Sequence, residues 1–309
     1  MPVPFPVLVG VPRSGTTLLR LMLDAHPQLA IPPETGFLLG DVARAPNPLA
    51  MARTISRFPP AAPAWPDYGL DASTFAIEAA RLSPSADVGA VLRLFYRLYA
   101  ERFGKPRSGD KTPRYLQLMP RVAKTLPEAH FIHIIRDGRD VALSWRKTWF
   151  APSRNIPHLV AEWAGQIGQA RQAASGLQYL EIRYDHLLTS TAACLERICR
   201  FIELPYTPAM LDYHLGADRR LQEHGARFRA DGSVVVSREQ RRQQQVLSSH
   251  PPDPSRLGVW CERLSQVDKD ACLQVAGPLL AEFASARAAI DVPGMAAATA
   301  ARRISRNKP

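Results

Sequence analysis

The sequence predicts an α/β protein whose central parallel sheet carries helices on both faces, in the three-layer arrangement of P-loop-like folds. Short apolar runs alternate along the chain with segments of helical periodicity, which is the pattern of a parallel sheet covered by helices. The best strand, at 129–135, is short, apolar and rich in β-branched residues, as a central strand is. The first strand, within 5–11, leads through a glycine-bounded loop into a helix, which is the order of a phosphate-binding loop.

Length and composition indicate a globular protein. The chain has 309 residues, of which 46% are hydrophobic and 22% are charged, and this suffices for one large core. We predict a single domain over residues 1–285, with helical or loop insertions at about 37–105 and 206–255 and a flexible basic tail at 286–309. No apolar run approaches the roughly 20 residues that span a bilayer, so no membrane partner is expected.

The cysteines and the start of the chain favour a cytoplasmic protein. The first strand begins so early that we expect no removable secretory segment before it. The four cysteines lack paired CxxC spacing, which favours thiols in a reducing compartment over a metal knuckle or a disulfide: Cys194, Cys199, Cys261 and Cys272.

The formal charge of +11 and the isoelectric point of about 9.9 suit a polyanionic partner. Nucleic acid, an anionic membrane surface and a highly charged small ligand all meet that description. Part of the excess charge lies in the tail, where Arg302, Arg303, Arg306 and Lys308 gather. Charge alone therefore does not choose among these partners.

In chain order, the N-terminal third reads as strand, loop and helix. The helix is predicted at 16–25, where leucines and a methionine recur at helical spacing. A second strand and loop are predicted at 29–34. Residues 45–70, rich in proline and alanine, are expected to form an irregular surface excursion. Helical periodicity returns at 73–102 and is interrupted by the segment GDKTP at 109–113.

The second half continues the alternation. After the strand at 129–135 we predict a helix through about Lys147, a strand at 177–182 and a helix at 191–202. Residues 216–255 are polar, with many arginines and glutamines, and carry little core signal. A mobile loop or lid is expected there.

Residues 10–17 (GVPRSGTT) fit the phosphate-binding pattern GxxxxGK[ST] at every fixed position except the lysine, which is replaced by Thr16. Backbone N–H groups and the helix N-terminus still form an anion cradle. Arg13 supplies charge earlier in the loop, and Ser14 and Thr17 add hydroxyl donors. Such a loop suits a 5′-phosphosulfate, which carries less charge than a triphosphate and needs no metal. The plainer interpretation is a glycine turn with incidental hydroxyls.

A second anion site is predicted at the end of the central strand. Arg136 follows Ile135 directly, and Ser144 lies about two turns inside the next helix. The planar guanidinium and the serine hydroxyl are expected to grip one phosphate together. Asp137 and Asp140 are predicted to cap or balance the helix N-terminus. The other basic residues of this helix are assigned to a solvated face: Arg139, Arg146 and Lys147.

Together these motifs resemble the family of sulfotransferases that depend on 3′-phosphoadenosine 5′-phosphosulfate (PAPS). PRSGTT (12–17) resembles the family's 5′-phosphosulfate loop, and IIRDGRDVALSW (134–145) resembles its 3′-phosphate strand and helix. GDKTP (109–113) matches a further family segment, and the longer run 12–35 resembles both bacterial sulfotransferases and the tyrosylprotein branch. The resemblance, scattered over about 5–205, implies a P-loop-like fold, PAPS as donor, adenosine 3′,5′-bisphosphate (PAP) as product, and no metal.

The resemblance also implies roles for individual residues. The phosphosulfate would be bound by Arg13, Ser14, Gly15, Thr16 and Thr17. The 3′-phosphate would be bound by Arg136 and Ser144. Tyr184 matches a family tyrosine on the adenosine side of the donor, with local packing as the alternative role. Arg256 is the counterpart of a late basic residue that closes over the donor, although Val259 stands where many bacterial relatives carry arginine.

Glu34 is the candidate general base, because the resembling tyrosylprotein branch has its catalytic glutamate at this place in the motif. The two preceding prolines would fix its direction, and capping a helix N-terminus is the alternative role. Lys111 and Arg13 are the candidates for stabilising charge on the leaving group. A surface ion pair with Asp110 is the alternative role for Lys111.

Histidine is the base in another branch of the family, so the histidines are weighed as well. His133 is expected in the buried core, and His26 is expected to hydrogen-bond locally in a turn. Nothing in the pattern marks His158 or His186 as catalytic. The glutamate therefore remains the favoured base.

The acceptor is predicted only by class. A small-molecule or glycan hydroxyl is favoured, with a phenol or peptidyl tyrosine next, since Pro33 and Gly36 depart from the tyrosylprotein pattern. Acceptor pockets are expected from 37–105, 148–175 and 206–255. The aromatic residues there either line a pocket or simply pack: Trp65, Tyr68, Trp149, Phe150 and Trp163. The oligomeric state is left open.

Three other functions compete with this interpretation. A P-loop small-molecule kinase would carry the missing lysine and a Walker-B strand ending in aspartate, whereas the best strand here runs into Arg136. A nucleic-acid-binding protein would cluster aromatic and basic residues on one surface, and the pattern does not favour such a partner. A donor-binding protein without turnover is disfavoured by the presence of both Glu34 and Lys111.

Overall fold

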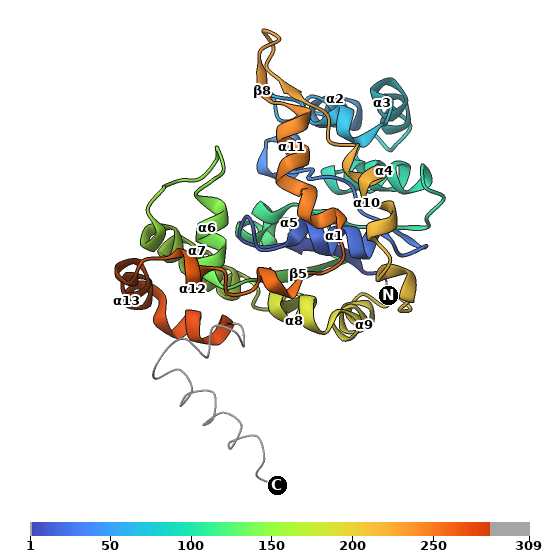
Figure 1. The fold of residues 1–309 in the computed structure, drawn as a ribbon. Coiled ribbons are helices and arrows are strands. Elements are labelled where there is room, and N and C mark those ends of the chain that lie inside the picture. The colour runs from blue at the N-terminus through green and yellow to red at the C-terminus, as the bar shows by residue number, and fades with distance from the viewer. Residues whose placement is uncertain (1, 285–309) are drawn as a thin grey trace.

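The computed structural model describes residues 2–284, and a four-stranded parallel sheet forms its framework (Figure 1). The strand order is β4–β1–β5–β6. The strands are β1 (Phe5–Val9), β4 (Asp110–Lys111), β5 (Ala129–Ile135) and β6 (Tyr179–Arg183). In the register, Val7 of β1 lies opposite Asp110 of β4 and Phe131 of β5. The predicted parallel sheet is therefore confirmed, while the predicted tail at 286–309 lies outside the described residues.

Helices cover both faces of the sheet, because alternate side chains of the inner strands point to opposite sides. Val7 and Phe131 belong to one buried core, with residues of α4, α5, α6 and α7. Leu8 and Ile132 belong to a second core, with residues of α1, α8 and α9. The bounds are α1 (Thr16–Asp24), α4 (Val88–Glu101), α5 (Met119–Thr125), α6 (Gly138–Trp145), α7 (Ile156–Ala173), α8 (Tyr184–Thr189) and α9 (Thr191–Phe201). These are the three layers that the sequence predicts.

The prediction of an irregular surface excursion at 45–70 is wrong, because this segment forms helices that pack into the core. It forms α2 (Pro48–Ser56) and the 3-10 helix η3 (Trp65–Tyr68). Asn47 caps α2 by accepting a hydrogen bond from the N–H of Ala50, and proline is favoured at the first helical position that follows such a cap. Trp65 stacks on Phe75 with ring centres 5.1 Å apart. Proline and alanine therefore mark a helix start and a close-packed helix here.

The predicted helix at 73–102 is two helices, α3 (Ala72–Ala80) and α4. The chain turns between them through a segment that contains Pro84, and Asp87 then caps α4 by accepting from the N–H of Ala90. A proline and a new cap together outweigh the continuing helical periodicity. The break places α4 against the sheet, where Phe95 is fully buried.

The long helix α7 lies in a stretch for which the sequence pattern yielded no predicted helix. Leu159, Trp163 and Ile167 are fully buried along one face of it, at the spacing of an amphipathic helix. Glycine and glutamine residues on the other face weaken the helical periodicity of the sequence. Trp163 therefore packs in the core and does not line an acceptor pocket.

Residues 216–255, expected to be a loop, contain regular structure. Their elements are α10 (His214–Leu221), a hairpin of β7 (Arg227–Phe228) and β8 (Val234–Val236), and α11 (Arg238–Gln245). Ser237 and Gln240 form a reciprocal capping box that starts α11. In Figure 1 the hairpin projects beyond α2, and α11 runs from it toward α1. This stretch has few apolar residues at regular spacing because ion pairs hold much of it against the rest of the protein.

The remaining elements are β2 (Leu29–Ala30), which pairs in parallel with β3 (Arg107–Ser108), and the C-terminal helices α12 (Trp260–Arg263) and α13 (Gln266–Phe283). Within residues 2–284, no helix combines the length and the apolar composition that crossing a bilayer requires.

Candidate active site

The sequence motifs gather at one edge of the sheet. The loop 10–15 follows β1, Thr112 follows β4 and Arg136 follows β5. Because these strands are parallel neighbours, their carboxyl ends meet at the same edge. Residues that are far apart in the sequence therefore contribute to one site.

The loop after β1 approaches its neighbours closely through two glycines. A Cβ atom at Gly10 would lie 2.9 Å from the carbonyl oxygen of Ile134, and one at Gly15 would lie 2.5 Å from the ring of Tyr184. Gly15 also has a φ of 103°, which favours glycine, and it directly precedes α1. The hydroxyl of Ser14 is buried without a hydrogen-bond partner among the described residues. A buried donor without a partner at the start of a helix fits an anion bound there.

Arg13 joins this loop to α6 and α11. Its Nε donates to the Ser144 hydroxyl at 3.1 Å, and its Nη2 donates to the Gln244 carbonyl at 3.4 Å. Burial, and then the nearby Arg136, lower the pKa of Arg13, because both disfavour its charged form. These two cations are held close together where they are partly buried, so a bound polyanion would offset the repulsion between them.

Arg136 lies over the aromatic face of Tyr184, with 4.7 Å between its guanidinium carbon and the ring centre. Its Nη2 donates to the backbone carbonyl of Arg256 at 2.9 Å, and its Nε is buried without a partner among the described residues. The Ser144 hydroxyl, which is predicted to bind the same phosphate as Arg136, accepts a hydrogen bond from Arg13 in this structure. Arg256 contributes its carbonyl oxygen to this contact.

The prediction that Arg139 belongs to a solvated face is wrong. Its side chain is buried, both oxygens of Asp137 accept its N–H groups at 3.0 and 2.7 Å, and its guanidinium carbon lies 3.4 Å from the centre of the Trp260 ring. Asp140 accepts the N–H groups of Gly258 and Trp260, each at 3.0 Å. The start of α6 thus holds the late loop 256–260 beside Arg136. The sequence pattern predicts both aspartates at the helix end and gives no signal for the contact of Asp140 with this loop.

Glu34 and Lys111 form an ion pair with 2.7 Å between Oε1 and Nζ. The Lys111 side chain is 2% exposed, whereas that of Glu34 is 55% exposed and so can be reached from outside. Burial of its surroundings raises the pKa of Glu34, but the attraction and hydrogen bond of Lys111 outweigh this and lower it overall. Burial lowers the pKa of Lys111, and Glu34 partly restores it. The structure therefore places together the two residues that the sequence assigns to catalysis.

A network of buried polar groups fixes the backbone around this pair. The Thr112 hydroxyl oxygen accepts the N–H groups of Thr35 and Gly36 at 3.2 and 3.1 Å. The Thr35 hydroxyl donates to Asp110 at 2.6 Å, and the Tyr96 hydroxyl donates to the same carboxylate at 2.8 Å. Asp110 is thus part of this network and not the partner of a surface lysine. Such a network holds Glu34 and Lys111 in register.

The histidines considered as alternative bases have other surroundings. His133 is fully buried inside β5 and hydrogen-bonds Tyr179 at 2.6 Å, as expected of a core residue. His26 accepts the N–H of Gln28 locally and also contacts the Pro205 carbonyl. His186 is exposed on α8.

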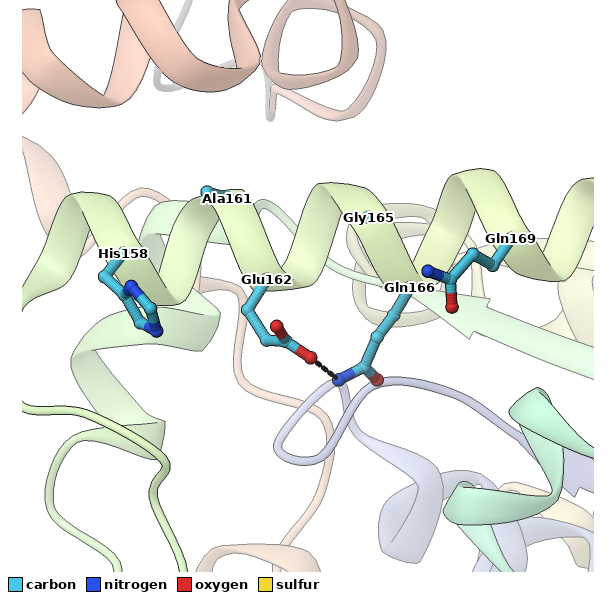
Figure 2. A pocket seen from close by; sticks show the side chains of 6 residues that line it. All are labelled: His158, Ala161, Glu162, Gly165, Gln166 and Gln169. Carbon is cyan, nitrogen blue, oxygen red and sulfur yellow. Dashed lines mark hydrogen bonds between the residues drawn. The ribbon is translucent and has the colours of Figure 1, made fainter.

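His158 lines a shallow pocket of about 250 Å³ along one face of α7. Figure 2 shows that this wall is a single helix, on which Glu162 accepts a hydrogen bond from Gln166 at 2.9 Å. None of the candidate donor or catalytic residues lines the pocket. It offers exposed polar side chains without a convergent buried group, so we do not assign it to the reaction.

Within residues 2–284, no cluster of three or more histidine, cysteine, aspartate or glutamate side chains has the arrangement of a metal site. The cations that lie in the two loops at the sheet edge, Arg13 and Arg136, suit the direct binding of an anion.

Comparison with known proteins gives a family match. The model of the sulfotransferase family matches residues 4–208. A protein-tyrosine sulfotransferase of Danio rerio is 27% identical over 288 residues, which cover 89% of this chain and 70% of that relative. The matched range includes both loops that are predicted to bind anions, as well as Glu34 and Lys111.

Solved structures show the same fold. The sulfotransferase domain of the Synechococcus PCC 7002 olefin synthase superposes with a TM-score of 0.57 at 19% identity, covering 90% of this chain and 94% of that domain. A mouse sulfotransferase in complex with PAP superposes with a TM-score of 0.50 at 14% identity, covering 91% of this chain and 89% of the other. At such identities the likeness concerns the arrangement of the chain.

Proposed function

This chain belongs to the sulfotransferase family, and we propose how its site transfers a sulfuryl group from PAPS to a hydroxyl group of an acceptor. One observation carries the proposal. Two buried donors without partners among the described residues, Ser14 Oγ and Arg136 Nε, follow two adjacent strands at the same edge of the sheet. Two anion sites on neighbouring strand ends suit a donor that carries phosphate at both ends of its nucleoside.

The loop after β1 is proposed to hold the 5′-phosphosulfate. It offers backbone N–H groups at the start of α1, the hydroxyls of Ser14, Thr16 and Thr17, and the charge of Arg13. Gly15 allows the close approach of Tyr184, and the guanidinium of Arg136 lies over the ring of the same tyrosine. We propose that the guanidinium of Arg136 binds the 3′-phosphate and that Ser144 and the loop at Arg256 complete this side.

Glu34 is proposed to act as general base and Lys111 to stabilise charge on the leaving group. Glu34 takes the proton of the acceptor hydroxyl while the acceptor oxygen bonds to sulfur. The bond between sulfur and the oxygen of the 5′-phosphate breaks, and its electron pair stays on that oxygen, so that PAP leaves. Lys111 and Arg13 hold the charge that develops there. Phosphoryl transfer shows the same dependence on positioning and electrostatics.

For the acceptor, we propose a small-molecule or glycan hydroxyl first and a phenol or peptidyl tyrosine next. The tyrosine-modifying relative supports the second choice, while Pro33 and Gly36 favour the first. Trp65 and Tyr68 are buried in the core. Trp149 and Phe150, which are 65% and 39% exposed after α6, remain available to an acceptor. We further propose a cytoplasmic location, no metal and no nucleic-acid partner.

Calorimetric titration with PAP tests the proposed donor, with ATP and magnesium as the comparison. Metal-independent binding of PAP supports a sulfotransferase site. Binding of ATP with magnesium and no binding of PAP would favour the kinase alternative. A screen of alcohols, glycans, phenols and tyrosine peptides with PAPS then identifies the acceptor class.

Arg136→Ala is expected to weaken PAP binding by roughly 10- to 100-fold, because hydrogen bonds to charged groups contribute about 1.5–3 kcal/mol. Lys147→Ala is the matched control, since Lys147 is an exposed cation just beyond the same helix. Calorimetry at one ionic strength measures both variants. Equal weakening by the two substitutions would mean that the overall positive charge of the protein attracts PAP, and that Arg136 at the end of β5 forms no specific contact with it.

A further inference from the structure

Asp67 in η3 joins the late part of the chain to the core. Its carboxylate accepts from Arg227 at 2.7 Å, from Arg241 at 3.0 and 2.8 Å, and from the N–H of Gly225 at 3.1 Å. The Asp67 side chain is only 1% exposed. One buried carboxylate therefore holds both arms of the late segment, which we define as residues 222–245.

The neighbouring residue holds the candidate base. Tyr68 is fully buried, and its hydroxyl donates to the backbone carbonyl of Glu34 at 2.9 Å. Adjacent residues of one short helix thus grip the late segment on one side and the backbone of Glu34 on the other.

The late segment brings charge to the site. Arg227 and Arg241 both act on the carboxylate of Glu34 and lower its pKa, in addition to Lys111, which acts more strongly. At its end, the Gln244 carbonyl accepts from the guanidinium of Arg13. The segment therefore reaches both the proposed base and the proposed phosphosulfate loop.

We propose that Asp67 is a positioning residue, which fixes the late segment against η3 so that the charges of Arg227 and Arg241 stay near Glu34. This inference rests on the proposed function for its catalytic part, while the attachment of the segment is independent of it. Asparagine at position 67 keeps the size and one acceptor oxygen but cannot balance two guanidinium groups. Loss of the carboxylate therefore releases the segment.

Hydrogen–deuterium exchange tests the attachment without any substrate. In Asp67→Asn, amides within 222–245 are expected to exchange at least about fivefold faster, as loss of a buried charged contact predicts, with β1 and β5 unchanged. Asp71→Asn is the matched control, because this exposed aspartate caps α3 and asparagine caps equally well. Unchanged exchange in Asp67→Asn would overturn the inference.

The pH dependence of transfer gives a second readout whose sign separates positioning from simple charge. The cations that act on Glu34 include Lys111, Arg241, Arg227 and Arg13. If Asp67 positions the two arginines, its loss lets them move away, the pKa of Glu34 rises, and the acid limb of kcat/KM moves to higher pH. If it only balances fixed charges, its loss strengthens their effect, and the limb moves to lower pH.

Absence of PAP binding by the wild-type protein contradicts the proposed function, whereas bound PAP with unchanged exchange in Asp67→Asn contradicts the inference alone. Should Asp67→Asn not fold, Arg241→Met leaves Asp67 paired with Arg227. It is then expected to give a smaller increase in exchange within 222–245, and no increase would count against the proposal.

Discussion

Replacement of Glu34 by glutamine is expected to lower kcat by about 10²- to 10⁴-fold, which is the usual contribution of a general base. Glutamine keeps the size of the side chain, and its amide oxygen can still accept from Lys111. The side chain is 55% exposed, so the change is expected to leave the fold intact. Because Glu34 lies outside the two proposed anion sites, PAP binding should stay within about twofold of wild type. Turnover and PAP titration together measure the effect.

The pH profile distinguishes loss of a base from loss of a contact. Lys111 holds the pKa of Glu34 below its usual value, so the wild-type base stays ionised through neutral pH. Activity should fall only as the pH drops through that lowered pKa, and this acid limb should disappear in Glu34→Gln. Glu78→Gln, a carboxylate on α3 away from the site, serves as the control. Turnover near the wild-type level in Glu34→Gln would mean that Glu34 is not the general base and that another group takes the proton.

The strand–loop–helix at 5–25 and the strand at 129–135 could be predicted because each is a local pattern. Their apolar runs, glycines and helix starts lie within a few residues of one another. The parallel sheet then follows from the alternation of such units. The two anion loops could be placed at one edge for the same reason, since parallel strands share the edge at which they end.

The contacts within the site could not be predicted in the same way. Glu34 and Lys111 lie 77 positions apart, and their meeting depends on the register of short strands. A two-residue strand such as β4 has no periodic signal. The sequence therefore indicates which residue types are present, while the pairing of Arg13 with Ser144 emerges only in the structure.

Buried charge is the other source of wrong predictions. Charged residues are seldom fully buried, so the sequence pattern predicts Arg139 on the surface and the arginine-rich late segment as a loop. In the structure the buried Arg139 lies between Asp137 and Trp260, and the partly buried Arg241 pairs with the buried Asp67. A charged residue can be buried where a specific partner balances it, and that partner can be far away in sequence.

Lys111→Met carries the second largest expected effect, a loss of about 10²- to 10³-fold in kcat, which is typical of removing one group that stabilises developing charge. Methionine has similar volume and suits a side chain that is 2% exposed. The substitution also removes the main attraction on Glu34, whose pKa is then expected to rise. The acid limb of the pH profile should therefore move to higher pH, even as the maximal rate falls.

Lys105→Met is the matched control for loss of a partly buried lysine, because its Nζ bonds the carbonyls of Asp24 and Leu29, away from Glu34. It is expected to change thermal stability while leaving the pH profile in place. A loss of turnover in Lys111→Met without movement of the acid limb would mean that Lys111 and Glu34 separate before the reaction. In that case Lys111 acts on the leaving group alone. Movement of the limb without loss of turnover would instead restrict Lys111 to holding Glu34.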